Sequence, residues 1–235
     1  MPLTRRQLLP LGPLGSLLIA GSLALGAGAA VAAPKAAAAP QVRFNTSMGD
    51  FVIEVYPDKA PKTVANFLQY VRSKHYDGTV FHRVINNFMI QGGGYDTRYV
   101  EKATRAPVPH EGRQSAKAGL RNTVGTVAMA RTNDPNSGAA QFFINVKDNS
   151  FLDPVQIPDG DPVAKFEYQG RTYTNVPRSS LLRSSQLYGY TVFGKVVSGM
   201  DVVNRIKAVP TGGNAQFPSD VPKQAVVINS ATQIK

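Results

Sequence analysis

A polar cluster among large apolar residues is the first place in this chain where chemistry could occur. The segment 80–94 alternates apolar and polar residues, turns at Asn86 and Asn87, and then runs through a second apolar stretch into three glycines. This pattern predicts a strand, a turn, a second strand and a sharp bend. Arg83 lies in the first strand, where a guanidinium is costly to desolvate unless it has a partner or a task. The alternative is an arginine that points to solvent from a half-buried strand.

A second segment repeats the theme of an amide placed beside aromatic residues. Gln141 precedes Phe142 and Phe143, as Gln91 closes the apolar run of the first segment. In a strand Phe142 shares one face with Ile144, which we expect in the core, while Phe143 shares the other face with Gln141. One cation, two amides and several large apolar side chains predict a groove for an uncharged, partly apolar ligand such as a peptide.

The sequence lacks the residues and motifs of several other kinds of active site. There is no cysteine, and His75, His82 and His110 have no metal-ligand spacing. No G-x-S-x-G motif is present, and the glycines at 92–94 are not followed by the Lys-Ser/Thr pair of a phosphate loop. His82 could act as a base beside Arg83, although a structural role is favoured. An enzyme built on this inventory would form no covalent intermediate and would use no metal or other cofactor.

The charge of the chain restricts its partners only weakly. The 235 residues carry a formal net charge of +11, with two of the arginines, Arg5 and Arg6, close to the start. No stripe of Lys and Arg interleaved with aromatic residues appears, so a solvated basic surface is favoured and no nucleic-acid partner is expected. The length is ample for one domain with a sizeable core.

The first 33 residues are typical of an export signal. Arg5 and Arg6 precede a Gly/Ala/Leu-rich run without acidic residues, and Ala30, Val31 and Ala32 offer the small residues of a cleavage site. Adjacent arginines indicate twin-arginine export, with the general secretory route as the alternative. A retained anchor is a further alternative, but we expect cleavage, no stable membrane association afterwards, and a periplasmic or other extracytoplasmic location. An Ala/Pro linker at 34–40 precedes the domain at 41–235.

The rest of the sequence predicts many short strands and two helices. Alternating residues at 42–46 and 51–55 predict a hairpin, and further strands are predicted at 123–130, 141–146, 190–196 and 225–231. A helix with one apolar face should begin at Pro61, and a shorter helix should cover 200–206. The segment 95–122 is predicted to be a loop. Strands at this spacing favour an antiparallel barrel.

The ordered motifs resemble those of cyclophilin-type peptidyl-prolyl cis-trans isomerases, the exported bacterial branch most of all. The resemblance covers 42–231 apart from 154–189, and it rests on these residues: Phe81, His82, Arg83, Val84, Ile85, Phe88, Met89, Ile90, Gln91, Gly92, Gly93, Met129, Ala130, Gln141, Phe142, Phe143, Ile144, Phe151, Leu152, Asp153, Val192, Phe193, Gly194, Lys195 and Val196. It implies a mainly β fold, a closed eight-stranded antiparallel β-barrel capped by two α-helices.

The resemblance also implies an activity, rotation about Xaa-Pro bonds, and a set of roles. Arg83 would be the catalytic residue, and Gln91 would hydrogen-bond the substrate backbone. The remaining residues would bind the proline ring, pair with the peptide or line the neighbouring subsite: Phe88, Met89, Ala130, Arg131, Gln141, Phe143, Phe151, Leu152 and Tyr190. The implied partners are proline-containing peptides and unfolded clients among exported proteins, without a cofactor.

Two residues depart from the pattern of many eukaryotic relatives. Phe151 stands where they have a tryptophan, and Tyr190 stands where they have a histidine. A cyclosporin-type cyclic peptide is therefore expected to bind weakly, because phenylalanine lacks the indole N–H and its larger face. The segment 154–189 is longer than the connection in related sequences and carries a predicted hairpin at 164–174, which either extends the peptide-binding surface or has no role. Rival functions are a peptide-binding chaperone with little turnover and a basic nucleic-acid-associated module.

Overall fold

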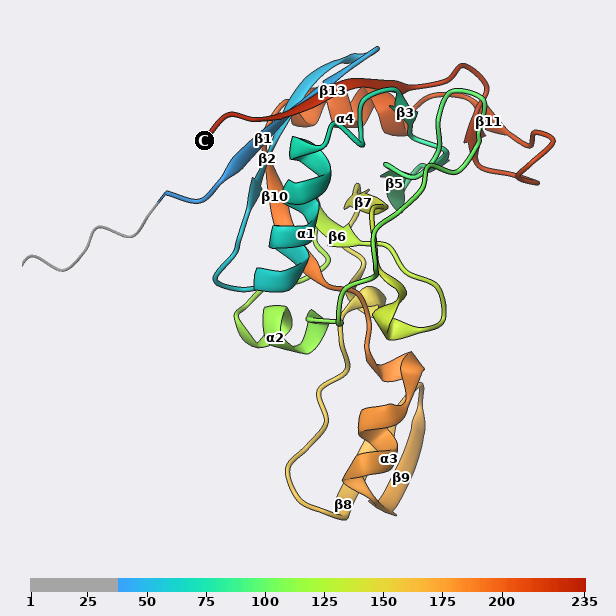
Figure 1. The fold of residues 1–235 in the computed structure, drawn as a ribbon. Helices are drawn as coiled ribbons and strands as arrows, with labels where there is room; N and C mark the ends of the chain where they lie inside the picture. The colour runs from blue at the N-terminus through green and yellow to red at the C-terminus, as the bar shows by residue number, and fades with distance from the viewer. Residues whose placement is uncertain (1–37) are drawn as a thin grey trace, which may run out of the picture. The chain divides into compact units, whose positions relative to one another are not determined.

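The computed structural model describes residues 38–235, and most of its regular structure is β. Nine strands form one antiparallel sheet in the order β3-β13-β1-β2-β10-β6-β7-β5-β4 (Figure 1). Their bounds are β1 Gln41–Thr46, β2 Gly49–Val55, β3 Thr79–Val80, β4 Arg83–Ile85, β5 Met89–Gly92, β6 Thr126–Met129, β7 Phe142–Asn145, β10 Val192–Ser198 and β13 Val227–Gln233. The end strands β3 and β4 belong to one stretch of chain, separated only by Phe81 and His82. The sheet therefore curls, which confirms the predicted mainly β antiparallel fold.

The first hairpin shows how the sequence pattern builds the core. Phe44 in β1 lies opposite Phe51 in β2, and their rings stack with centroids 5.2 Å apart. Both side chains are buried, whereas Arg43, the residue before Phe44, is exposed. The Thr46 hydroxyl donates to the Gly49 carbonyl across the turn, where Gly49 adopts a φ of +117° that favours glycine. The predicted alternation at 42–46 and 51–55 is confirmed.

Two helices cover the sheet, as the sequence predicted. α1, Pro61–Arg72, begins with proline at its first turn and buries Val64, Phe67 and Val71. The unpaired N–H groups of its first turn donate to the Glu111 carboxylate, from Lys62 at 3.0 Å and Thr63 at 2.8 Å. α4, Met200–Lys207, buries its apolar side in the same way.

Further short helices were not predicted. The segment 95–122, predicted to be a loop, contains α2, Gly112–Lys117, and α3, Arg178–Arg183, lies in the segment 154–189. Three single turns of 3₁₀-helix also occur: η1 Pro135–Ser137, η2 Ser150–Leu152 and η3 Ser185–Leu187. α2 has one turn and no sustained apolar period, so the sequence carried little signal for it.

The long segment 154–189 builds a small structure of its own. β8, Val163–Tyr168, and β9, Arg171–Val176, pair as a separate two-stranded sheet, and α3 packs beside them (Figure 1). Val163, Phe166, Leu181 and Leu187 form an apolar cluster distinct from the main core. The predicted hairpin at 164–174 is confirmed. A third, very short pair joins β11, Thr211–Gly212, to β12, Val221–Pro222.

The predicted export signal at 1–33 lies outside the described residues, as does most of the linker at 34–40. Within residues 38–235, no helix has the length and apolar character needed to cross a membrane.

Candidate functional site

Strand register places the key polar and aromatic side chains side by side on one face of the sheet. Arg83 in β4 lies opposite Gln91 in β5, and Gln91 lies opposite Phe143 in β7. The alternate residues of these strands, such as Ile90 and Ile144, point into the core and are fully buried. The row from Arg83 to Phe143 must therefore occupy the outer face of the sheet.

This row borders a cavity of about 180 Å³. Its walls are Arg83, Phe88, Met89, Gln91, Ala130, Arg131, Phe143, Leu152 and Tyr190. A second apolar cluster, centred on Met89, Ala128, Phe143 and Val192, forms the floor. The structure thus brings together in one cavity nine of the residues that the resemblance singled out, leaving Gln141 and Phe151 outside it. The cavity can accept a small apolar ring with a cation and an amide at its edge.

Arg83 is more exposed than the sequence alone implied. Its side chain is 46% exposed, so its guanidinium is only partly desolvated, and it has an acidic partner. The guanidinium Nε lies 3.8 Å from a carboxylate oxygen of Asp220, and the Asp220 carbonyl accepts a 2.8 Å hydrogen bond from the Val84 N–H. No sequence signal pointed to Asp220, because it lies far along the chain from Arg83.

Two amides connect the cavity to a wider groove. Gln91 donates from Nε2 to Oε1 of Gln141 at 2.9 Å. Gln141 lines an adjoining hollow of about 300 Å³ with Glu101 and Thr104. Gln91 and Gln141 also line a hollow of about 380 Å³ that Arg83 and Phe217 border. An extended chain could therefore pass over Gln91 with one side chain in the central cavity.

The Tyr190 ring forms one wall of the cavity and is held from two directions. It meets Phe143 edge-on, with ring centroids 5.4 Å apart. The Arg131 guanidinium lies over the Tyr190 ring, 4.6 Å from its centroid, in a cation–π contact. This arrangement gives an apolar wall with a fixed orientation.

Comparisons with known proteins point to one family. Residues 41–233 match the family model described as cyclophilin type peptidyl-prolyl cis-trans isomerase/CLD. A peptidyl-prolyl cis-trans isomerase of Streptomyces antibioticus is 50% identical over 81% of this chain and 96% of its own. Peptidyl-prolyl cis-trans isomerase B of Escherichia coli (strain K12) is 47% identical over 81% of this chain and 98% of its own.

Solved structures match the fold as well. The crystal structure of a Cryptosporidium parvum cyclophilin, in the presence of the dipeptide Ala-Pro, covers 83% of this chain and 99% of its own. The TM-score is 0.55 at 22% sequence identity, which supports the fold alone. The chain belongs to the cyclophilin-type peptidyl-prolyl cis-trans isomerase family. This cyclophilin is accordingly an isomerase of Xaa-Pro peptide bonds.

Phe151 does not line the cavity but lies beside Phe88, which does. Its side chain is 73% exposed, and its ring stacks on that of Phe88 with centroids 5.7 Å apart. Leu152, the next residue, does line the cavity. A ligand larger than a proline ring would therefore meet Phe151 beyond the cavity edge.

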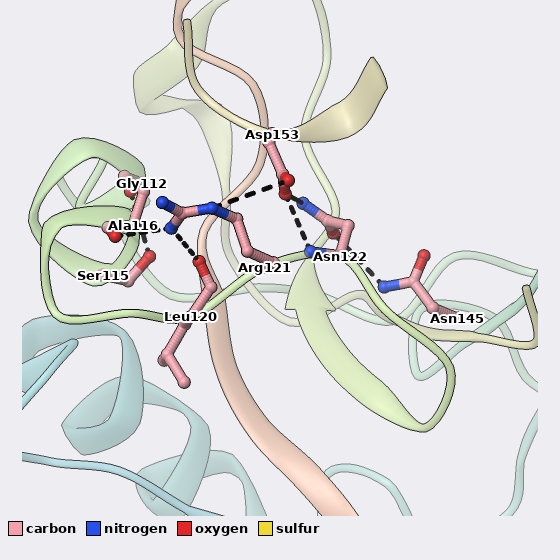
Figure 2. Close-up of polar contacts among 8 residues, drawn as sticks. All are labelled: Gly112, Ser115, Ala116, Leu120, Arg121, Asn122, Asn145 and Asp153. Atoms are coloured by element: carbon pink, nitrogen blue, oxygen red, sulfur yellow. Dashed lines mark hydrogen bonds and ion pairs between the residues drawn. The ribbon is translucent and has the colours of Figure 1, made fainter. Parts of the chain in front are cut away.

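A polar network supports the side of the cyclophilin pocket that carries Leu152. Figure 2 shows the Asp153 carboxylate facing Asn122 and Arg121, with Asn145 on the other side of Asn122. Oδ1 of Asp153 accepts from both the backbone N–H and the side-chain amide of Asn122, each at 2.8 Å. These bonds connect the end of η2 to the loop before β6. The nearest cation of the network, Arg121 Nε, lies 4.0 Å from the Asp153 carboxylate.

The same network continues to the backbone of Phe88, another residue that lines the pocket. Asn145 donates to Oδ1 of Asn122 at 3.2 Å and accepts from the Asn149 amide at 2.8 Å. Asn149 also donates to the Phe88 carbonyl at 2.8 Å. Asn145 and Asn149 are buried, and a buried polar group without a partner is expensive, so this network fixes Phe88 and Leu152 relative to each other. Sequence reasoning missed these asparagines, because single amides carry no distinctive pattern.

His82 is a buried neutral side chain in this cyclophilin. Burial, and next the charge of Arg83, lower its pKa to about 4. Its ring packs against Tyr95 with centroids 4.7 Å apart, and its Nδ1 has no hydrogen-bond partner. These contacts favour the structural role over a catalytic base. Within residues 38–235, no three His, Asp or Glu side chains group as metal ligands would.

Proposed function

We propose that this cyclophilin binds the proline ring of its substrate in the 180 Å³ cavity and uses Arg83 as the catalytic residue. The observation that carries the proposal is the register row Arg83–Gln91–Phe143, which sets a cation and an amide beside an apolar cavity. The proline ring would lie on Met89 and Phe143. Gln91 would hold the substrate backbone, and Gln141 would line the subsite beyond it.

Amide resonance explains why such a site accelerates the reaction. Rotation about a peptide C–N bond meets a barrier of roughly 18–20 kcal/mol, and the bond before proline interconverts in tens to hundreds of seconds. The twisted amide loses resonance, so its nitrogen becomes pyramidal and regains a lone pair. A donor aimed at that nitrogen stabilises the twisted amide and neither planar isomer, which is what catalysis requires.

Arg83 has the properties that this role needs. Its guanidinium presents several N–H groups in a rigid plane. The closest atoms of the pair are Nε and a carboxylate oxygen of Asp220, 3.8 Å apart, which is too long for a hydrogen bond and leaves N–H groups of the fork for the substrate. The apolar walls remove water from the ring side of the amide, and this strengthens the electrostatic interaction. The reaction requires no proton transfer and no cofactor.

A binding experiment tests where the proline lies. Titration of an isotope-labelled chain with a short Ala-Pro peptide should shift the amide signals of Gln91, Ala130 and Phe143. A Phe143→Ala variant, which removes the floor of the cavity, should lose most of this response. Shifts confined to residues 155–188 would contradict binding in the cavity and would favour a chaperone-like surface instead.

We further propose that the natural clients are exported proteins that fold outside the cytoplasm. The support is the leader at 1–33, with Arg5, Arg6 and the small residues Ala30, Val31 and Ala32. Mass spectrometry of the protein from its native source should find a new N-terminus after Ala32. An N-terminus at Met1 or Pro2 would contradict export with cleavage. Changing Arg5 and Arg6 together to lysine should block export only if the twin-arginine route is used.

A further inference from the structure

One backbone carbonyl, that of Gly189, accepts hydrogen bonds from two side chains of distant parts of the chain. Arg131 donates from Nε at 2.9 Å, and His110 approaches with Nε2 at 3.2 Å. We call this group, formed by His110, Arg131 and the Gly189 carbonyl, the Gly189 clamp. Two donors on one acceptor fix the position of that peptide unit better than either donor alone.

The His110 ring is satisfied in a single neutral tautomer. Its Nδ1 accepts a 3.1 Å hydrogen bond from the Gly112 N–H, so the ring proton is on Nε2, which can then donate to Gly189. The ring fits there because residue 112 is glycine, since a Cβ at that position would overlap it. The Tyr188 ring closes the other side edge-on, with centroids 5.3 Å apart.

Gly189 lies where the chain returns from the segment 154–189 to the pocket. Its φ is +60°, and a Cβ would overlap the backbone of Asp153 and Pro154, so the outgoing and returning chains touch at this glycine. The next residue, Tyr190, donates its N–H to the Leu152 carbonyl at 2.9 Å and forms a wall of the cavity. Any shift of the Gly189 peptide would therefore move Tyr190.

We propose that His110 is a positioning residue for the isomerase pocket, acting through the Gly189 clamp on Tyr190 and Arg131. This inference rests on the proposed binding of proline in the cavity. His110 lines neither that cavity nor the hollows beside it, so its effect on the reaction must pass through the residues that it holds.

The charges around the ring give the clamp a pH dependence. Arg131 and Arg113 disfavour a charged His110, whereas Glu111 and the Gly189 carbonyl favour it. Burial has the largest effect, and the pKa of His110 is lowered to about 4. Protonation at Nδ1 would also break the hydrogen bond from Gly112. The Gly112 N–H should therefore hold the ring in place at neutral pH and lose that hold as the pH falls through about 4, while Nε2 can still donate to Gly189.

The test compares two substitutions that differ in one hydrogen bond. His110→Gln keeps an N–H donor near the Nε2 position, whereas His110→Leu removes it. A lost hydrogen bond of ordinary strength corresponds to a factor of roughly 2 to 10, so His110→Leu should lower kcat/KM for an Ala-Pro peptide by that factor and His110→Gln should restore most of it. His75→Leu is the matched control, because His75 also binds a glycine carbonyl, Gly93 at 3.1 Å, but neither neighbour of Gly93 lines any of the three hollows.

Three further readouts separate positioning from stability. The chemical shifts of the Tyr190 ring should change in His110→Leu and should stay at their wild-type values in His110→Gln and His75→Leu. In a Tyr190→Ala background, His110→Leu should cost much less activity, because the residue it positions is gone. NMR exchange spectroscopy can follow isomerisation at acidic pH, because it needs no coupling protease. Near pH 4 the kcat/KM of the wild type should fall more steeply than that of His110→Gln. Both proteins retain His82, so its titration affects both alike.

The proposal is overturned if His110→Leu, folded at the assay temperature, keeps wild-type kcat/KM and unmoved Tyr190 signals. Equal losses in the leucine and glutamine variants would also overturn it. If the Tyr190 signals respond as expected but no variant changes turnover, the clamp exists and the placement of the reaction in this cavity is wrong. The two ideas therefore fail in distinguishable ways.

Discussion

Replacing Arg83 by alanine should damage the reaction far more than the fold. The Arg83 side chain is 46% exposed, its partner Asp220 is 34% exposed, and their closest atoms are 3.8 Å apart. Exposed ion pairs of this kind contribute about 0–1 kcal/mol to stability. Arg83→Ala should therefore melt close to the wild-type temperature, so that any loss of turnover can be assigned to chemistry.

The size of the loss follows from the role of the guanidinium. A preorganised donor to developing charge is typically worth about 2.7–4 kcal/mol in a water-excluded site. Arg83 is half exposed, so solvent screening should reduce this to about 2–3 kcal/mol. At 1.36 kcal/mol per tenfold, kcat/KM should fall about 30- to 160-fold.

A protease-coupled assay on a short Xaa-Pro peptide measures this loss directly. Arg83→Lys should also be poor, because an ammonium lacks the planar fork. Asp220→Asn is the matched control, since it removes the ion pair but leaves the guanidinium, and it should retain activity within a few fold. If Arg83→Ala retains activity within about threefold, the assignment of the catalytic donor is wrong.

Three other predictions concern the rest of the molecule. Replacing residues 155–188 by a short Gly-containing linker, with Gly189 kept, should preserve turnover of a four-residue peptide and weaken turnover of an unfolded protein client; equal effects on both substrates would leave the segment without a role. Burial lowers the pKa of His82 and His110 to about 4, while both titrate near 6.5 in the unfolded chain. The free energy of unfolding should therefore be highest above about pH 6.5 and should decrease as the pH is lowered toward 4, because the unfolded chain binds these protons first. Chemical denaturation across this range measures the decrease, and a flat profile would contradict the pKa assignments. Phe151→Trp should tighten inhibition by a cyclosporin-type cyclic peptide, because the exposed Phe151 ring beside Phe88 would be replaced by a larger face with an N–H donor; tight inhibition of the unchanged protein would count against this reasoning.

The sequence predicted the parts of the fold that rest on short-range periodicity. Alternation at Phe142, Phe143 and Ile144 separated core from pocket correctly, since Phe142 and Ile144 are fully buried and Phe143 belongs to the apolar cluster of the pocket. The apolar face of α1 was equally clear. These patterns can be read locally because a strand repeats every two residues and a helix every 3.6.

The parts that the sequence did not predict depend on contacts between distant residues. The short pair β11–β12 brings Asp220, the residue before β12, next to β4, where it meets Arg83. His110 and Gly189 are 79 positions apart in the sequence, and Asn145 at the end of β7 hydrogen-bonds to Asn122 in the loop before β6. A single side chain that acts at such a distance leaves no periodic trace, so only the folded structure shows its partner.

The contact between the outgoing and returning chains at Gly189 also means that the segment 154–189 can be replaced by another segment. Its outgoing and returning chains are joined by the hydrogen bonds from Tyr190 to Leu152, at 2.9 Å, and from Val155 to Leu187, at 3.1 Å. With the two ends already held together, a different segment can be accommodated at little additional cost in loop-closure entropy. Evolution could therefore lengthen, shorten or replace this segment without redesigning the main sheet. A protein engineer could likewise graft a foreign binding module between Pro154 and Gly189 and deliver an isomerase to a chosen client.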